Sequence, residues 1–228
     1  LSITSGGNNV AIGYQAGDAL TTASENIAIG YAAFGAADAG EGGNVVIGNE
    51  AGNAINNSGA DHNVIIGISA GQGGSGAMAQ CVAIGKGAMN STSSNAQTGT
   101  VAIGSDALNA LTSGQYNTAL GYKSLEDCAI GDKNTAIGYQ TLIQANVSND
   151  GANTAVGYDA GREVTSGIDN VYIGSNAGTS VTTGEKNTIV GAEAFSAANG
   201  DEDYNVCIGY QTGDTIDNGN NNTLVGSG

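Results

Sequence analysis

Residues that could carry out catalysis are few in this sequence, and their spacing fits no common catalytic arrangement. His62 is the only histidine, which leaves no basis for histidine-based triads or multi-histidine metal sites. Two neighbouring carboxylates could hydrolyse a glycosidic bond. Four acids do share one position of a sequence repeat, but never in consecutive copies: Glu50, Asp106, Asp159 and Glu193. We therefore predict that the chain is not an enzyme and has no catalytic residues.

Acidic residues also fail to form a recognisable metal site. Asp201-Glu202-Asp203 is the densest cluster, and Asp150 and Asp217 lie in segments rich in Asn and Gly. A Ca²⁺ ion needs about six to eight oxygen ligands, whereas these acids do not recur in phase with the repeat. We predict solvated loops and no bound metal.

Glycine and cysteine spacing gives no cofactor site either. Gly71, Gly73 and Gly76 match a dinucleotide-binding loop, but no Rossmann strand and helix flank them. The cysteines are odd in number and fall at three different repeat positions: Cys81, Cys128 and Cys207. They are predicted to be small buried residues without a complete disulfide framework. No cofactor is expected.

A tandem repeat accounts for the whole chain. A pentapeptide of Asn, a β-branched residue, a small residue, an aliphatic residue and Gly recurs thirteen times at spacings of 17–19 residues. We call its last residue the pivot glycine and number the repeats as coils 1 to 13. The pivots are Gly13, Gly30, Gly48, Gly67, Gly85, Gly104, Gly121, Gly138, Gly157, Gly174, Gly191, Gly209 and Gly226.

The repeat predicts one short strand per coil. The enrichment in Val, Ile and Thr before the pivot is typical of strands, and the pivot ends the strand because a positive φ or a close backbone approach is needed there. We expect a second short strand after the pivot. Residues 1–228 should thus form a single all-β array, a parallel β-solenoid of 13 coils of 17–19 residues.

Two columns of the repeat could be functional. Asn stands four before the pivot in every coil except those with Cys81 and Thr100, and is expected to form a stacked hydrogen-bonded ladder. Tyr follows the pivot in six coils: Tyr14, Tyr31, Tyr122, Tyr139, Tyr158 and Tyr210. The tyrosines are expected to pack at a corner of the coil. The alternative is contact with a glycan, because a tyrosine offers an apolar face and a hydroxyl group.

The strands predict association with further copies of the chain. Three consecutive residues before each pivot are apolar or Thr, and none of the 21 acids falls there. One strand face fills the coil, and the other needs a covering layer. We predict a homo-oligomer, with a parallel homotrimer as the favoured form. Tyr172 replaces a small residue in its strand, so a local widening or a changed contact is expected there.

The charge excludes two classes of partner. The net charge is −16, with only five Lys and Arg residues. Such a chain repels nucleic acids and anionic membrane surfaces. No apolar run approaches the ~20 residues of a membrane helix. We expect neither nucleic-acid binding nor membrane insertion.

Asn9-Val10-Ala11-Ile12-Gly13 and the equivalent pentapeptides resemble the head repeat of YadA-like trimeric autotransporter adhesins. Asn134–Gln140 is even more similar to the Asn-Thr-Ala-Ile-Gly-Tyr-Gln repeats of phage tail-fibre and virion appendage proteins. The resemblance implies a left-handed β-roll, three chains about one axis and an extracellular role in attachment. Longer coils, and Val or Thr in place of the YadA-family Ser, put collagen or matrix binding in doubt and favour the fibre.

Three functional classes follow. The first is an excerpt of a longer phage or virion fibre protein that binds a cell-surface glycan or protein receptor. The second is the head of a bacterial surface adhesin. The third is a ligand-binding solenoid, such as an ice-binding or glycan-processing protein. Ice binding needs a regular Thr array, but Thr stands three before the pivot in only five coils and is expected to point inward.

Overall fold

The computed structural model describes residues 5–37, 40–74, 76–92, 96–146, 150–197, 200–216 and 219–228. The chain divides into two compact units, Leu1–Tyr116 (unit 1) and Asn117–Gly228 (unit 2). The described residues form strands and turns and contain no helix. The predicted all-β fold is confirmed.

Each repeat contributes one three-residue strand that ends directly before its pivot glycine. In unit 1 these strands are β1 (Val10–Ile12), β2 (Ile27–Ile29), β3 (Val45–Ile47), β4 (Val64–Ile66), β6 (Val82–Ile84) and β8 (Val101–Ile103). In unit 2 they are β9 (Thr118–Leu120), β10 (Thr135–Ile137), β11 (Thr154–Val156), β12 (Val171–Ile173), β13 (Thr188–Val190), β14 (Val206–Ile208) and β15 (Thr223–Val225).

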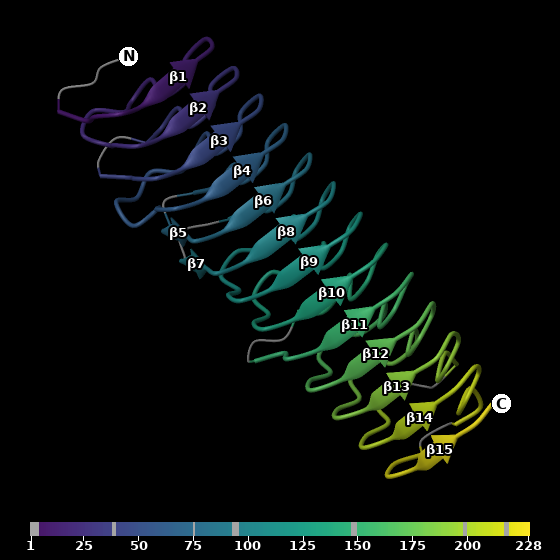
Figure 1. Cartoon of the computed structure of the whole chain (residues 1–228). Helices are drawn as coiled ribbons and strands as arrows, with labels where there is room; N and C mark the ends of the chain where they lie inside the picture. The colour runs from purple at the N-terminus through teal and green to yellow at the C-terminus, as the bar shows by residue number, and fades with distance from the viewer. Residues whose placement is uncertain are drawn as a thin grey trace. The chain divides into compact units, whose positions relative to one another are not determined.

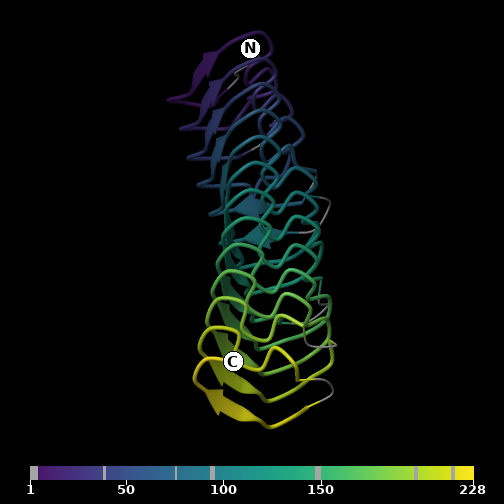
Figure 2. The ribbon, with the colours of Figure 1, turned by 90° about the vertical axis from the view of Figure 1, so that its right-hand side faces the viewer.

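Within each unit the strands are parallel and pair in one register. Ala11 of β1 lies opposite Ala28 of β2, and Ala136 of β10 lies opposite Ala155 of β11. Each repeat makes one turn of the chain, and successive turns stack on one another in both units (Figures 1 and 2). The predicted parallel β-solenoid, with one strand per repeat, is confirmed.

The predicted second strand after the pivot is wrong. The residues after the pivots of coils 1 to 12 form turns, and the two residues after the last pivot form no strand. Two additional strands, β5 (Met78–Ala79) and β7 (Gln97–Thr98), come before the main strand of their coils and pair with each other. The backbone after the pivot cannot stay extended because it turns twice through the left-handed region.

These left-handed residues occupy fixed columns of the repeat. The 28 described non-glycine residues with positive φ all stand five before, two after or four after a pivot, with φ between 45° and 62°. Each costs about 1 kcal/mol or more in an L-residue. In coil 8, Lys133, Gln140 and Leu142 occupy the three columns. Gln140 and Leu142 donate their N–H groups to neighbouring coils, to Tyr122 O and Ala160 O, at 3.0 and 3.1 Å. These bonds hold the strained turn in place.

The core consists mainly of small and aliphatic side chains inside each coil, together with the buried rings of Phe34, Tyr172 and Phe195. The middle residue of the strand, two before the pivot, points inward and is buried in all coils except the first and last. The position four after the pivot also faces inward, with either Gly or a large apolar residue such as Phe34 or Leu142. The Tyr172 ring packs beside Gly161 and Gly178. Its strand is not disturbed, since Tyr172 still pairs with Ala155 and Ile189.

Candidate functional site

The pivot glycines are structural, and the backbone requires glycine at these positions for two reasons. Their φ angles lie between 133° and 145°, a region that L side chains rarely adopt. A Cβ on Gly138 would also collide with the carbonyl oxygen of Gly157, the pivot of the next coil. The same collision occurs at every pivot that is followed by another pivot in its own unit. The two reasons predicted for glycine at this position are therefore both confirmed.

The outward face of the strands is an apolar surface, which we call the outer face. It consists of the residues three before and one before each pivot, because the middle residue points inward. Most of these side chains are half-buried by their neighbours in adjacent coils. Ile173 and Ile208 are each 40% exposed, and Leu120 is 43% exposed. No acidic or basic residue stands on this face.

The composition of the outer face differs between the two units. In unit 1 all twelve outer positions are Val or Ile. In unit 2, five of the seven residues three before the pivot are Thr: Thr118, Thr135, Thr154, Thr188 and Thr223. The expectation that these threonines point inward is wrong. Strand residues alternate between faces, and the inward place belongs to the middle residue.

This correction bears on the ice-binding alternative. The outward threonines of unit 2 make a run of only three consecutive coils, after which Val171 and Val206 interrupt the column. A regular Thr array is therefore absent from this face of the described strands.

The six tyrosines after the pivots are exposed, and five of them stack. Tyr14 lies on Tyr31 with ring centroids 5.6 Å apart. Tyr139 lies between Tyr122 and Tyr158, at 5.4 and 5.0 Å and with interplanar angles of 19° and 3°. The sixth, Tyr210, is 52% exposed, and its hydroxyl lies 3.4 Å from Glu193 Oε2. The row therefore presents mostly ring edges and hydroxyl groups. Glycan contact by these residues stays a prediction.

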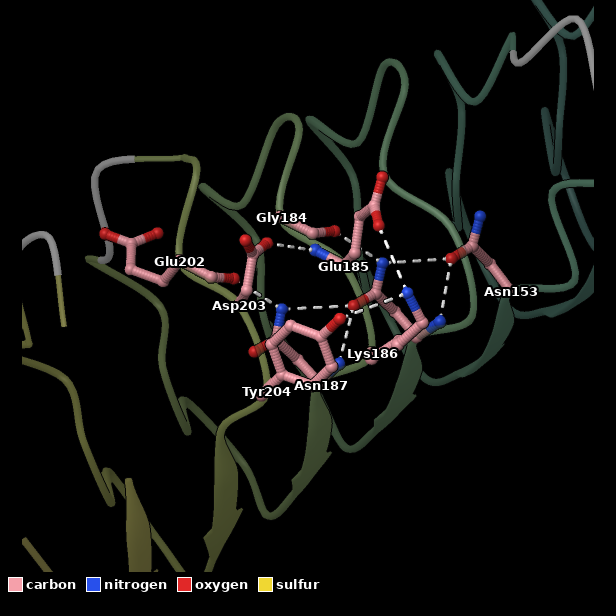
Figure 3. A network of polar contacts seen from close by, with 9 residues as sticks. Asn153, Gly184, Glu185, Lys186, Asn187, Glu202, Asp203 and Tyr204 are labelled. Carbon is pink, nitrogen blue, oxygen red and sulfur yellow. Dashed lines mark hydrogen bonds and ion pairs between the residues drawn. The ribbon is translucent and has the colours of Figure 1, made fainter. Parts of the chain in front are cut away.

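The asparagines four before the pivot form the predicted ladder. Asn153 Oδ1 accepts hydrogen bonds from the backbone N and the Nδ2 of Asn170, both at 3.1 Å. Asn153 Nδ2 donates to Gly167 O of the next coil at 2.8 Å. The arrangement recurs two coils further on, with Asn187 Nδ2 donating to Glu202 O at 2.7 Å (Figure 3). Because these side chains are buried and hydrogen-bonded, the ladder is structural.

The ladder changes where Asn is replaced. Asn63 Oδ1 accepts a hydrogen bond from the backbone N of Cys81 at 2.9 Å. The Cys81 side chain has no amide group, so it has no oxygen that could accept the equivalent hydrogen bond from the following coil. In this coil and the next, β5 and β7 pair directly through their backbones, with Gln97 N donating to Ala77 O at 2.9 Å. In these two coils, hydrogen bonds between the backbones of β5 and β7 therefore replace the hydrogen bonds of the asparagine side chains.

The three acidic residues at 201–203 lie in different environments and do not form one cluster of carboxylates. Asp201 is exposed, Glu202 is buried, and Asp203 Oδ1 accepts from Glu185 N at 2.8 Å. Lys186 Nζ lies 3.5 Å from the Tyr204 hydroxyl and 3.3 Å from Glu185 Oε2 (Figure 3). The hydrogen bond that Lys186 donates to Tyr204, followed by the one it donates to Glu185, raises the pKa of Lys186. Among the described residues no three His, Cys, Asp or Glu side chains form a metal-binding group. Asp217 lies outside the described residues.

The other candidate residues are not brought together. His62 is exposed, as expected. Cys81, Cys128 and Cys207 are free and buried, and burial raises the pKa of Cys128 to about 12. Gly71 lies in the turn after β4 and Gly73 lies just beyond that turn, and no helix follows in the described residues, so they form no dinucleotide loop. Four acids stand at the position two residues after a pivot. Burial raises the pKa of one of them, Asp159, and the nearby charge of Arg162 opposes this effect.

Sequence reasoning missed a surface cavity of about 420 Å³ in unit 1. Tyr31 lines it together with polar side chains of coils 1 and 3, Asp18 and Glu50 among them. The sequence indicates this cavity only through two small residues of coil 2, at positions where most other coils carry larger polar residues.

Comparisons of the chain with protein-family models, with curated proteins and with solved structures find no match. The part of the chain that the structure describes contains no helix long and apolar enough to cross a membrane. Functional conclusions about this chain therefore depend on its own residues and their geometry.

Proposed function

We propose that the chain is a structural and adhesive fibre module that acts as a parallel homotrimer outside the cell. The favoured assignment is a phage tail fibre or virion appendage used in host attachment. The alternative is the head region of a bacterial trimeric autotransporter adhesin. Both assignments use the repeat as a stiff scaffold and the surface of the coils for contact with a glycan or protein receptor.

The outer face is the observation that carries this proposal. It is apolar or Thr at every position, and its coil-to-coil register makes it continuous within each unit. Contiguous apolar surfaces of this kind mark interaction sites in soluble proteins. A second copy of the same chain presents a matching face with the same coil spacing, so parallel copies can pack coil against coil.

Charge supports the same arrangement. The net charge is −16, yet no acid stands on the outer face. Charges are concentrated elsewhere in the coil, where they favour solubility. Close approach of the outer faces therefore buries apolar surface without burying a carboxylate. The proposed partners are further copies of the chain and a receptor; nucleic acid, membrane insertion and catalysis are not part of the proposal.

Light scattering coupled to size exclusion tests the assembly. We expect a particle of three times the 22.3 kDa chain mass. Ile84→Glu places a charge on the outer face of β6 and is expected to yield a monomer or an unfolded chain. Ser91→Glu is the matched control, because Ser91 is exposed in the same coil away from that face.

A stable wild-type monomer of 22.3 kDa with cooperative unfolding would refute the proposal. Equal assembly of the Ile84→Glu and Ser91→Glu variants would show that copies associate through another surface. The two assignments are separated by the flanking domains, since a virion-attachment domain marks a fibre and a membrane-anchoring domain marks an adhesin.

A further inference from the structure

A surface cavity of unit 1 combines an aromatic ring with several polar groups in its lining. Its volume is about 420 Å³. Gln15 and Asp18 of coil 1 lie on one side, and Glu50 and Asn53 of coil 3 lie on the other. Tyr31 of coil 2 also lines it. This size falls within the range of about 300–1,000 Å³ that is common for small-ligand sites.

The cavity exists because coil 2 lacks side chains that its neighbours have. Two after the pivot it carries Ala32, where coils 1 and 3 carry Gln15 and Glu50. Five after the pivot it carries Gly35, and no other coil has glycine at that position. A Cβ on Gly35 would approach Asn53 Oδ1 to 2.8 Å. The polar side chains of coils 1 and 3 therefore border a notch that is one coil wide.

The ring of Tyr31 carries a stacked ring on one face only. Tyr14 stacks on it at 5.6 Å, while coil 3 has Asn49 in the tyrosine column and so continues no stack. Tyr31 is 48% exposed. In the longer stack of unit 2, Tyr139 has rings on both faces. Tyr31 thus combines exposure with a neighbouring cavity.

We propose that this cavity binds an uncharged sugar ring at the end of a cell-surface glycan, an inference that rests on the proposed attachment function and specifies its partner. Sugar hydroxyl groups both donate and accept hydrogen bonds. The amides of Gln15 and Asn53 supply donors and acceptors, and the carboxylates of Asp18 and Glu50 supply acceptors. The C–H face of a sugar ring matches the apolar face of Tyr31.

Charge selects among the candidate ligands. Two carboxylates at the cavity and a net charge of −16 repel sialic acids, uronic acids and phosphates. A lysine or arginine side chain of a protein partner would be attracted, but it only donates hydrogen bonds. The donor groups of Gln15 and Asn53 would then have no acceptor. An uncharged sugar uses both kinds of group.

The test is a microarray of glycans that end in unsubstituted galactose, glucose, mannose or N-acetylglucosamine, with sialylated and glucuronylated counterparts. Bound members are then titrated as methyl glycosides by calorimetry. We expect binding to neutral termini and none to acidic ones. Ala36→Trp fills the cavity, because Ala36 lines it and has no positive φ. This variant and Tyr31→Ala should each weaken binding at least tenfold.

Tyr116→Ala is the matched control, because Tyr116 is a tyrosine of unit 1 that is 55% exposed, lies outside the column after the pivot and does not line the cavity. It should bind as the wild type does. Binding by Ala36→Trp equal to wild type, a preference for acidic glycans, or no binding to any neutral terminus would overturn the proposal. So would capture of basic peptides alone. Light scattering of the same samples separates the two proposals, since an intact trimer without glycan binding contradicts only this one.

Discussion

Single residues stabilise this fold mainly by linking one coil to the next. Asn153 is buried and makes four side-chain hydrogen bonds, three to the following coil and one from its Nδ2 to Asn134 Oδ1 of the preceding coil at 3.3 Å. Its own backbone N is in turn held by Asn134 Oδ1 at 3.1 Å. A buried polar group without a partner costs about 1–3 kcal/mol. The column therefore favours a side chain with both a donor and an acceptor.

We predict that Asn153→Ala lowers the free energy of unfolding by about 2–4 kcal/mol, because the N–H of Asn170 and the carbonyl of Gly167 lose their buried partners. Asn56→Ala is the control, since Asn56 is exposed. Urea denaturation followed by circular dichroism measures both. A loss that is the same for the two variants would show that the ladder does not stabilise the fold.

At the scale of the coil, the strand and the turn after it share one limited interior. Coils with Leu or Met four after the pivot have Ala in the middle of the strand, as in Ala136 with Leu142. Where the strand carries Tyr172, that position is Gly178, and a Cβ there would collide with the Tyr172 ring. Coil 11 is the exception, with Ile189 and Phe195. Large residues at one position are thus mostly matched by small ones at the other.

We predict that Tyr172→Ala destabilises the protein by about 3–5 kcal/mol, because it leaves a cavity beside Gly161 and Gly178. Adding Gly178→Leu should recover part of this loss, since it creates the Ala and Leu pair found in coil 8. Thermal unfolding of the two single variants and the double variant forms a complete cycle. A double variant that loses more stability than the two single variants lose together would contradict the matched packing.

The pivot allows a second prediction at this scale. Gly138→Val should lower stability by at least about 3 kcal/mol or prevent folding, because a β-branched residue cannot adopt a φ of 144° and its Cβ would meet Gly157 O. Asp150→Ala removes only an exposed ion pair with Lys133, which is worth about 0–1 kcal/mol. Differential scanning calorimetry compares them. Equal melting temperatures would exclude the proposed role of the pivot.

For the whole molecule, charge and apolar surface act in opposite directions. The chain has 21 acids and five bases, so the described ion pairs, such as Lys123 with Glu126 at 3.0 Å, can offset little of the repulsion. The outer face has none of these charges. Association through that face would bring three strongly negative chains together, and repulsion between them would be screened by salt.

We therefore predict that the melting temperature rises between 10 and 150 mM NaCl. Each kcal/mol of screened repulsion is worth about 2–4 °C for a chain of this length. Sucrose at matched osmolality is the control, because it changes the solvent without screening charge. A melting temperature that falls as salt is added would mean that attractive ion pairs outweigh the repulsion.

The strands, the pivots and the asparagine ladder could all be predicted from the repeat. Each of these features depends on a residue type that recurs at one position, such as the glycine that ends the strand or the amide that links two coils. Periodicity also indicated that the three strand residues have two apolar faces. It did not identify the inward face, and Thr118 and its equivalents were consequently assigned to the wrong side.

The conformation after the pivot and the shape of the surface depend on contacts between coils. Residues such as Gln140 and Leu142 have no preference for positive φ, yet they adopt it because hydrogen bonds to neighbouring coils hold them there. The cavity beside Tyr31 likewise needs three coils, since the missing side chains of coil 2 matter only between the longer ones of coils 1 and 3. Contacts between residues 17–19 positions apart set these features, and local residue preferences do not encode them.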